Sequence, residues 1–223
     1  MEAVILECGD FPKKEYPREL LRRADVIICC DRALDTFLRH RDKIFKDRRE
    51  PDAIIGDMDS ISPKHLKEYS DIAIKVEEQD DNDQTKAFRH LLEHWPEVKT
   101  VHLLGATGKR EAHTIGNLSL LMEYARTYGA SGNPPEDGIF VDMVSDYSTA
   151  FALTDSCELA VGEGRPVSLF SPDNSLTIKS EGLVWQTGSV LFDNWWKASL
   201  NRAHSDIIRL TFSHKSIALV ILD

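Results

Sequence analysis

Two clusters of carboxylates lie close together in the sequence. Asp57-Met58-Asp59 ends an apolar, strand-like run, and Asp80-Asp81-Asn82-Asp83 precedes a helix-like stretch that carries Lys86. Packed carboxylates repel one another unless a cation neutralises them, and oxygen ligands suit a hard ion such as Mg²⁺. Because Mg²⁺ takes one or two protein carboxylates together with waters and phosphate oxygens, the clusters favour a site for nucleotide phosphates.

Each cluster also has a simpler interpretation. An isolated Asp-x-Asp is more often a pair of solvated loop aspartates, and only the second cluster shifts the balance toward a bound ion. Asp83 suits the N-cap of the following helix, a role that is compatible with metal binding. Lys86, one turn later, is placed to neutralise a phosphate or to form a surface ion pair.

The segment Gly105–Arg110 is a candidate phosphate cradle. It joins a strand-like run to a helix, its small residues allow the backbone to approach an anion, and Lys109 and Arg110 add positive charge. Glycines after a strand also mark tight turns, and the Lys-Ser/Thr ending of a Walker loop is missing. His113 and Asn117 on the next helix fit either ligand contacts or capping and core roles.

The elements around these motifs alternate in the manner of an α/β domain. Helical spacing marks residues 85–95 and 114–128, the latter with an apolar face of Ile115, Leu118, Leu121, Met122 and Ala125. Short apolar runs, which predict strands of a largely parallel sheet, lie at 3–6, 26–30, 53–55, 72–76, 101–104 and 140–144. Because ligand sites lie beyond the carboxyl ends of such strands, we expect the motifs to converge on one sheet edge.

A second domain is predicted after this part. Beyond the polar segment 129–138, short β-like pieces replace helical periodicity, so we expect an α/β domain over residues 1–145 and a β-sandwich over 146–223. The predicted antiparallel strands lie at 151–153, 167–170, 176–178, 207–212 and 217–222.

Composition narrows the classes of function. The 223 residues carry a net charge of −10, which argues against binding to nucleic acid or an anionic membrane. The four cysteines are irregularly spaced, which indicates reduced thiols, and the chain has neither a signal peptide pattern nor an apolar run of membrane-spanning length. The expected location is the cytoplasm.

Read in order, the motifs resemble those of the thiamine pyrophosphokinase family. Pro51–Ser60 is similar to the family's PDxIIGDxDS segment, and Gln79–Lys86 is similar to QDxxDxxK. Gly105–His113 followed by Asn117 resembles GxxGxRxDH…N. In the carboxyl half, Gly182–Trp185 resembles GLKW, and Ser199 with Asn201 resembles SxSN.

This resemblance implies an amino-terminal Rossmann-like α/β domain with a mainly parallel sheet, a carboxyl-terminal antiparallel β-sandwich, and a homodimer with active sites at the subunit interface. It implies that Asp57, Asp59 and Asp83 hold magnesium with Asp80 nearby. The nucleotide phosphates would meet Asp31, Lys86, Thr107 and Arg110, with His113 and Asn117 as further binding residues. Thiamine would meet Trp185, Ser199 and Asn201; an aromatic face suits its cationic ring.

Two positions depart from the family pattern. Ala112 stands where the family usually has aspartate, and Arg32 stands where it has glycine. The expected activity is pyrophosphoryl transfer from ATP to thiamine, with AMP leaving and with Asp80 or Asp83 as candidate proton acceptors. The alternatives are a thiamine- or nucleotide-binding regulatory protein that has lost turnover, which Ala112 motivates, and a metal-dependent phosphohydrolase.

Overall fold

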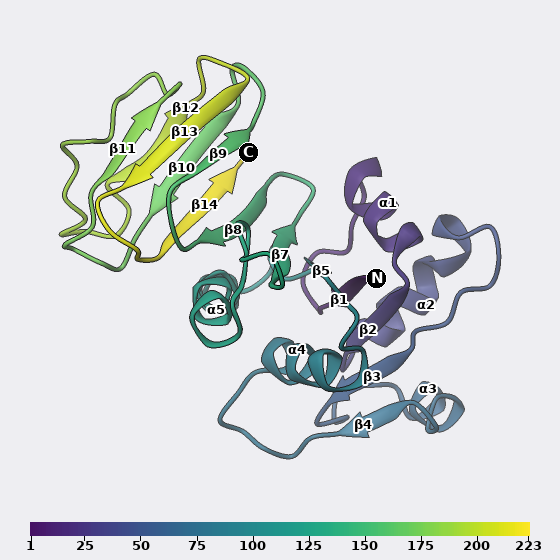
Figure 1. Cartoon of the computed structure of the whole chain (residues 1–223). Helices are drawn as coiled ribbons and strands as arrows, with labels where there is room; N and C mark the ends of the chain where they lie inside the picture. The colour runs from purple at the N-terminus through teal and green to yellow at the C-terminus, as the bar shows by residue number, and fades with distance from the viewer. The chain divides into compact units, whose positions relative to one another are not determined.

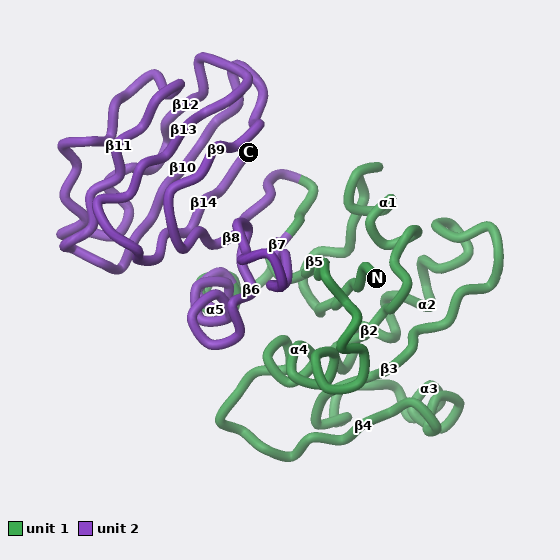
Figure 2. The backbone as a smooth tube through the Cα atoms, viewed as in Figure 1, with its two compact units in different colours: residues 1–117, 144–146 green, residues 118–143, 147–223 purple.

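The computed structural model describes residues 1–223 and divides into two compact units, shown as a ribbon in Figure 1 and in two colours in Figure 2. Unit 1 comprises residues 1–117 and 144–146, and unit 2 comprises residues 118–143 and 147–223. Helix α5 (Glu111–Tyr128) begins in unit 1 and ends in unit 2. No helix combines the length and the apolar character needed to cross a membrane.

Unit 1 is built on five parallel strands in the order β5-β1-β2-β3-β4. The central strands are buried along nearly their whole length, which is why they appear in the sequence as continuous apolar runs rather than alternating ones. The strands are β1 (Glu2–Leu6), β2 (Val26–Cys30), β3 (Ala53–Gly56), β4 (Ala73–Lys75) and β5 (Thr100–Leu104).

Helices cover both faces of this sheet. One core cluster joins Leu20 and Phe37, from the first two helices, to strand residues such as Val4 and Ile54. The fourth helix contributes nothing to that cluster but contacts β2 and β3, so by the alternation of side chains along a strand it covers the opposite face. The helices are α1 (Glu15–Arg23), α2 (Ala33–Ile44), α3 (Pro63–Glu68) and α4 (Asp83–His94).

The strand order places a topological switch point between β1 and β5. From β1 the sheet grows through β2, β3 and β4 in one direction, whereas β5 pairs with the other side of β1. At such a point the loops that leave two neighbouring strands diverge and open a crevice beyond their carboxyl ends. The residues that follow β1 and β5 therefore form a crevice in unit 1.

Unit 2 is a β-sandwich. One sheet has the order β12-β10-β14-β8-β7 with β6 paired to β7, and the other has the order β11-β13-β9. Residues of both sheets, including Leu169 and Leu210, share one core cluster. The strands are β6 (Ala130–Ser131), β7 (Ile139–Val144), β8 (Thr149–Leu153), β9 (Cys157–Ala160), β10 (Pro166–Phe170), β11 (Ile178–Glu181), β12 (Ala198–Arg202), β13 (Ile207–Phe212) and β14 (Ala218–Leu222).

The predicted fold class, a mainly parallel α/β sheet followed by an antiparallel β-sandwich, is confirmed. One detail was wrong. The strand expected at 176–178 begins only at Ile178, because a turn at residues 174–175 precedes it. The helix expected at 114–128 lies within α5, and along its apolar face Leu121 is enclosed whereas Ile115 is 55% exposed.

Candidate functional site

A cavity of about 520 Å³ lies in unit 1 at the carboxyl ends of the strands. Its wall contains residues that follow β1, β2, β3 and β5 and the first turns of α4 and α5. The expected convergence of the motifs on one sheet edge is therefore confirmed. The predicted site residues that line the cavity are Asp31, Asp57, Asp83, Lys86, Thr107, Arg110, His113 and Asn117.

Asp31 occupies a constrained position at the end of β2. Its backbone has a φ of 45°, in the left-handed region, and its side chain is buried. One carboxylate oxygen, Oδ2, accepts a hydrogen bond from the Ser60 hydroxyl, whereas Oδ1 is enclosed and has no hydrogen-bond partner. A side chain at Gly56 would place its Cβ 2.8 Å from the Cβ of Asp31, so glycine is required there.

Asp83 and Lys86 share the first turn of α4. The predicted N-cap role of Asp83 was wrong, because the side chain of Asn82 accepts from the backbone N–H of Thr85 at 3.0 Å and caps the helix instead. The Lys86 ammonium is buried 3.7 Å from Oδ1 of Asp83. Burial raises the pKa of Asp83 above its usual range, Lys86 opposes this, and the carboxylates of Asp31 and Asp57 raise it further.

Glu7 is a site residue that the sequence reasoning missed. It follows β1 directly and lines the cavity. Its Oε2 accepts from the side-chain amide of Asn117 at 2.8 Å, while its Oε1 is enclosed without a hydrogen-bond partner. Burial and the carboxylate of Asp83 raise the pKa of Glu7 to about 8, against a smaller lowering by Asn117. The available signal was an acidic residue directly after the apolar run at residues 3–6.

The cavity also carries positive charge. Lys109 donates a hydrogen bond to the carbonyl oxygen of Cys8, which fixes its position. Arg32 and Arg110 line the cavity with exposed side chains that form no hydrogen bond or ion pair within the chain. Two unpaired guanidinium groups beside several carboxylates are suited to a ligand that carries both phosphates and a cation.

Asp59 and Asp80 lie outside the cavity wall. Both are exposed, and the backbone N–H of Asp59 donates to Oδ1 of Asp57 at 3.0 Å. Their roles at a metal or reacting group stay predictions. Ala112 and Glu111 also lie outside the wall, although Arg110 and His113 on either side of them contribute to it.

The predicted thiamine residues lie together in unit 2. The side-chain amide of Asn201 donates to the carbonyl oxygen of Trp185 at 2.6 Å and accepts from its N–H at 3.2 Å. Ser199 and Leu200 form a bulge in β12, since two residues there oppose one residue of β10. Unit 2 also exposes several large apolar side chains: Val184, Trp185, Leu191, Trp195, Trp196 and Leu200 are each at least 47% exposed.

The oxygen atoms of the unit 1 cavity could bind a divalent cation only together with ligands that do not belong to the protein. No group of three or more His, Cys, Asp or Glu side chains is arranged to hold a metal ion by itself. The enclosed, unpartnered oxygens of Asp31 and Glu7 nevertheless are hard donors that lack any proton donor or cation. This is the pattern expected where Mg²⁺ is completed by waters and phosphate oxygens.

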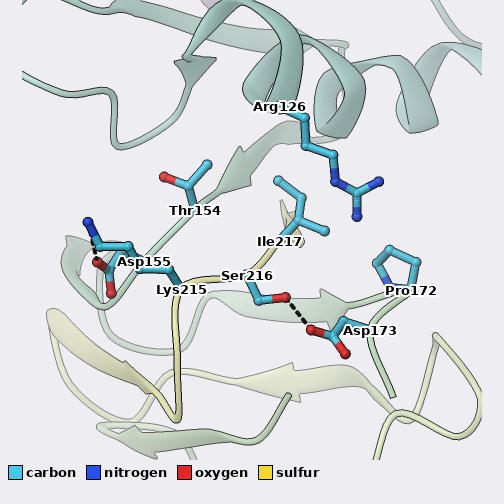
Figure 3. A pocket seen from close by; sticks show the side chains of 8 residues that line it. All are labelled: Arg126, Thr154, Asp155, Pro172, Asp173, Lys215, Ser216 and Ile217. Carbon is cyan, nitrogen blue, oxygen red and sulfur yellow. Dashed lines mark hydrogen bonds and ion pairs between the residues drawn. The ribbon is translucent and has the colours of Figure 1, made fainter. Parts of the chain in front are cut away.

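A second cavity of about 490 Å³ lies in unit 2 and is shown in Figure 3. Its charged groups largely satisfy one another: Lys215 lies 3.8 Å from Asp155, and Asp173 accepts from the Ser216 hydroxyl at 2.5 Å. None of the predicted site residues lines it. The wall consists of Arg126, Thr154, Asp155, Pro172, Asp173, Lys215, Ser216 and Ile217.

The fold and the unit 1 cavity define a two-part α/β and β-sandwich protein whose ligand crevice lies at the switch point of a parallel sheet. Two family models match the chain: "Thiamin pyrophosphokinase, catalytic domain" over residues 17–129, and "Thiamin pyrophosphokinase, substrate-binding domain" over residues 150–219. The chain belongs to the thiamin pyrophosphokinase family.

Individual relatives agree with this assignment. Thiamine pyrophosphokinase 1 of rice (Oryza sativa subsp. japonica) is 33% identical over 154 residues, which are 62% of this chain and 53% of the rice protein, so the match spans about half of that relative. The fold is similar to that of thiamin pyrophosphokinase from Geobacillus thermodenitrificans (TM-score 0.75, 19% identity, 100% and 97% of the two chains covered). It is also similar to the Candida albicans enzyme (TM-score 0.76, 17% identity, 99% and 88% covered).

Proposed function

We propose that this chain transfers a pyrophosphoryl group from ATP to thiamine and releases AMP. The observation that carries the proposal is the unit 1 cavity, which combines enclosed carboxylates with the buried Lys86 and the unpaired Arg32 and Arg110 at a sheet switch point. This set of charges is complementary to a polyphosphate accompanied by a divalent cation. The family assignment supports thiamine as the alcohol that accepts the group.

In the proposed reaction the hydroxyl oxygen of thiamine attacks the β-phosphorus of ATP. The bond from the β-phosphorus to the oxygen that bridges it to the α-phosphorus breaks, AMP leaves with that oxygen, and the hydroxyl proton passes to a nearby base. Lys86 and Arg110 would stabilise the negative charge that spreads over the transferred group. Asp83 lines the cavity and is the better placed of the two candidate proton acceptors, because Asp80 lies outside it.

Magnesium is part of the proposal, with Asp57, Asp59 and Asp83 as the expected protein ligands. When bound, the ion would neutralise phosphate charge and hold the polyphosphate in position. Support comes from Asp57 and Asp83 in the cavity wall and from the enclosed Oδ1 of Asp31 beside them. The Asp59 carboxylate would have to turn toward the ion from its exposed position.

Thiamine is proposed to bind through unit 2. The 59% exposed ring of Trp185 offers a face to the cationic thiazolium, with a contribution of roughly 0.5–2 kcal/mol. The other large apolar side chains that unit 2 exposes would be covered in the proposed homodimer, whose active sites would combine residues of two chains. We further propose that residues 1–145 bind ATP and magnesium and that residues 146–223 bind thiamine.

A cytoplasmic location stays a prediction.

The test is an assay of AMP formation with ATP and Mg²⁺, run with and without thiamine. The proposed function predicts AMP and thiamine diphosphate in equal amounts, and only when thiamine is present. Formation of ADP, or the absence of any product, would contradict it. Thiamine binding without AMP release would instead support the regulatory alternative, and thiamine-independent phosphate release would support the phosphohydrolase.

A further inference from the structure

Glu7 lines the unit 1 cavity but has no role in the proposed function. It lies just beyond β1, where its backbone N–H donates to the carbonyl oxygen of Leu104 at the end of β5. The hydrogen bond is 2.8 Å long and fixes Glu7 at the switch point. Glu7 precedes residues 17–129 that the catalytic family model matches, and it belongs to none of the motifs that resemble the family.

The two oxygens of the Glu7 carboxyl group have different surroundings. Oε2 accepts from Asn117, whose side chain is held in turn by the carbonyl oxygen of Ala106 at 2.9 Å and by the amide of Asn82 at 3.0 Å. This chain of hydrogen bonds fixes the orientation of the Glu7 side chain. Oε1 is enclosed and has no hydrogen-bond partner, which leaves one hard oxygen donor of a positioned carboxyl group unused.

The charges around Glu7 point to a cation as the missing partner. Asp83 is the charged neighbour with the largest influence on it, and the buried ammonium of Lys86 is paired with Asp83 rather than with Glu7. Asp31, more than nine-tenths buried in the same cavity wall, presents a second enclosed oxygen without a partner. Polyphosphate brought into this wall would repel the Asp31 carboxylate unless a cation entered with it, and the unpartnered oxygen of Glu7 is a hard donor for that cation.

We propose that Glu7, through its Oε1, is a direct ligand of the divalent cation that enters the cavity with the nucleotide. The cation is then held from the end of β1 as well as from the loop that carries Asp57 and the first turn of α4, which carries Asp83. This inference rests on the proposed function for the identity of the ligand, but it is tested by binding alone.

The experiment measures binding of α,β-methylene ATP, an analogue that resists this transfer, by calorimetry over a range of free Mg²⁺ concentrations. In Glu7→Gln, the amide oxygen still accepts the hydrogen bond from Asn117, but the second carboxyl oxygen, which would bind the cation, is replaced by an NH2 group that cannot. We expect the variant to need about tenfold more Mg²⁺ to reach the wild-type affinity. Without Mg²⁺ we expect it to bind the analogue equally or more tightly, because no contact with a cation is then lost and an acidic group has been removed from the cavity wall.

A loss of affinity that occurs only in the presence of Mg²⁺ distinguishes a metal ligand from a residue with a structural role. Weaker binding both with and without Mg²⁺ would mean that Glu7 only positions Asn117, and an unchanged Mg²⁺ dependence would mean that Glu7 is not a ligand; either result overturns the proposal. Glu93→Gln, at an exposed carboxylate of α4 outside the cavity, is the matched control. Should Glu7→Gln fail to fold, Glu7→Asp withdraws the carboxylate by one methylene and is expected to raise the Mg²⁺ requirement likewise. The proposed function fails separately, if the wild-type chain releases no AMP.

Discussion

Asn201 and Trp185 are joined by two hydrogen bonds between the side-chain amide of one residue and the backbone of the other. Because the Asn201 amide is used in this way, its main effect on a ligand would pass through the orientation of the Trp185 ring. The pair therefore acts as one unit, although sixteen positions separate the two residues in the sequence.

The first prediction concerns this pair. Trp185→Leu is expected to weaken thiamine binding by about tenfold, within the roughly 0.5–2 kcal/mol of a cation–π contact. Asn201→Ala should weaken it less, since the ring is displaced rather than lost. The double variant should match Trp185→Leu alone in calorimetric titrations with thiamine. Additive losses would show that Asn201 contacts thiamine independently.

Lys86→Met is expected to lower kcat for AMP formation by about 100-fold. The substitution removes a buried cation that lies next to Asp83, where negative charge would develop during transfer. Steady-state rates at saturating ATP, thiamine and Mg²⁺ measure the effect. Lys179→Met, at an exposed lysine of β11 that lies 4.0 Å from Glu181, is the control. A loss of less than threefold would exclude Lys86 from the reaction.

Arg32→Ala and Arg110→Ala should each weaken binding of α,β-methylene ATP by about tenfold, because each removes a charged donor that is unpaired in the free protein. For Arg32, which stands where the family has glycine, the direction of the change in affinity also shows whether the side chain contacts the nucleotide favourably or obstructs it. Arg126→Ala, in the unit 2 cavity, should leave nucleotide binding unchanged. Tighter binding by Arg32→Ala would show crowding.

Stability should depend on pH through Glu7. The folded chain keeps a proton on Glu7 up to a pKa of about 8, whereas the unfolded chain releases it near the ordinary value of 4.5. The folded state thus binds more protons in this window, so stability falls as pH rises from about 4.5 to about 8. In thermal melts with EDTA, the stability of Glu7→Gln should not fall in this way between pH 4.5 and 8, and the variant should have a higher Tm than the wild type at pH 9. If the plots of Tm against pH run parallel for the two proteins, Glu7 does not have the raised pKa.

Ala112→Asp is expected to change kcat by less than about twofold under the proposed function. Ala112 is exposed and lies outside the cavity wall, so a carboxylate there adds only a favourable charge near the start of α5, worth about 0.3–1 kcal/mol of stability. Rates of AMP formation provide the comparison. An increase of more than tenfold would favour the regulatory alternative, in which this position accounts for lost turnover.

The sequence predicted the core of the fold well because burial leaves a clear pattern. The run at 26–30 coincides with β2, which is buried on both faces, and the alternating run at 207–212 coincides with β13. Two strands with few buried residues were missed: no residue of β9 and only two residues of β12 are buried, and both strands are held by pairing with neighbours distant in sequence. Such pairing leaves no local pattern of hydrophobicity.

The candidate site was predictable where motif and strand end coincide, as for Asp31, Asp57 and Thr107. Glu7 was missed because its importance comes from enclosure by Asn117 and Asp83, which are more than seventy positions away in the sequence. The capping of α4 by Asn82 rather than Asp83 also depends on local geometry, since both residue types are good N-caps.

The switch point between β1 and β5 has a consequence for folding. Strand β1 cannot complete its hydrogen bonds until β5, made almost one hundred residues later, has arrived beside it. The cavity wall therefore does not exist in any amino-terminal fragment that ends before Leu104. Nucleotide added during refolding would bind only the finished α/β unit and would stabilise it by mass action, while early intermediates would gain nothing from the ligand.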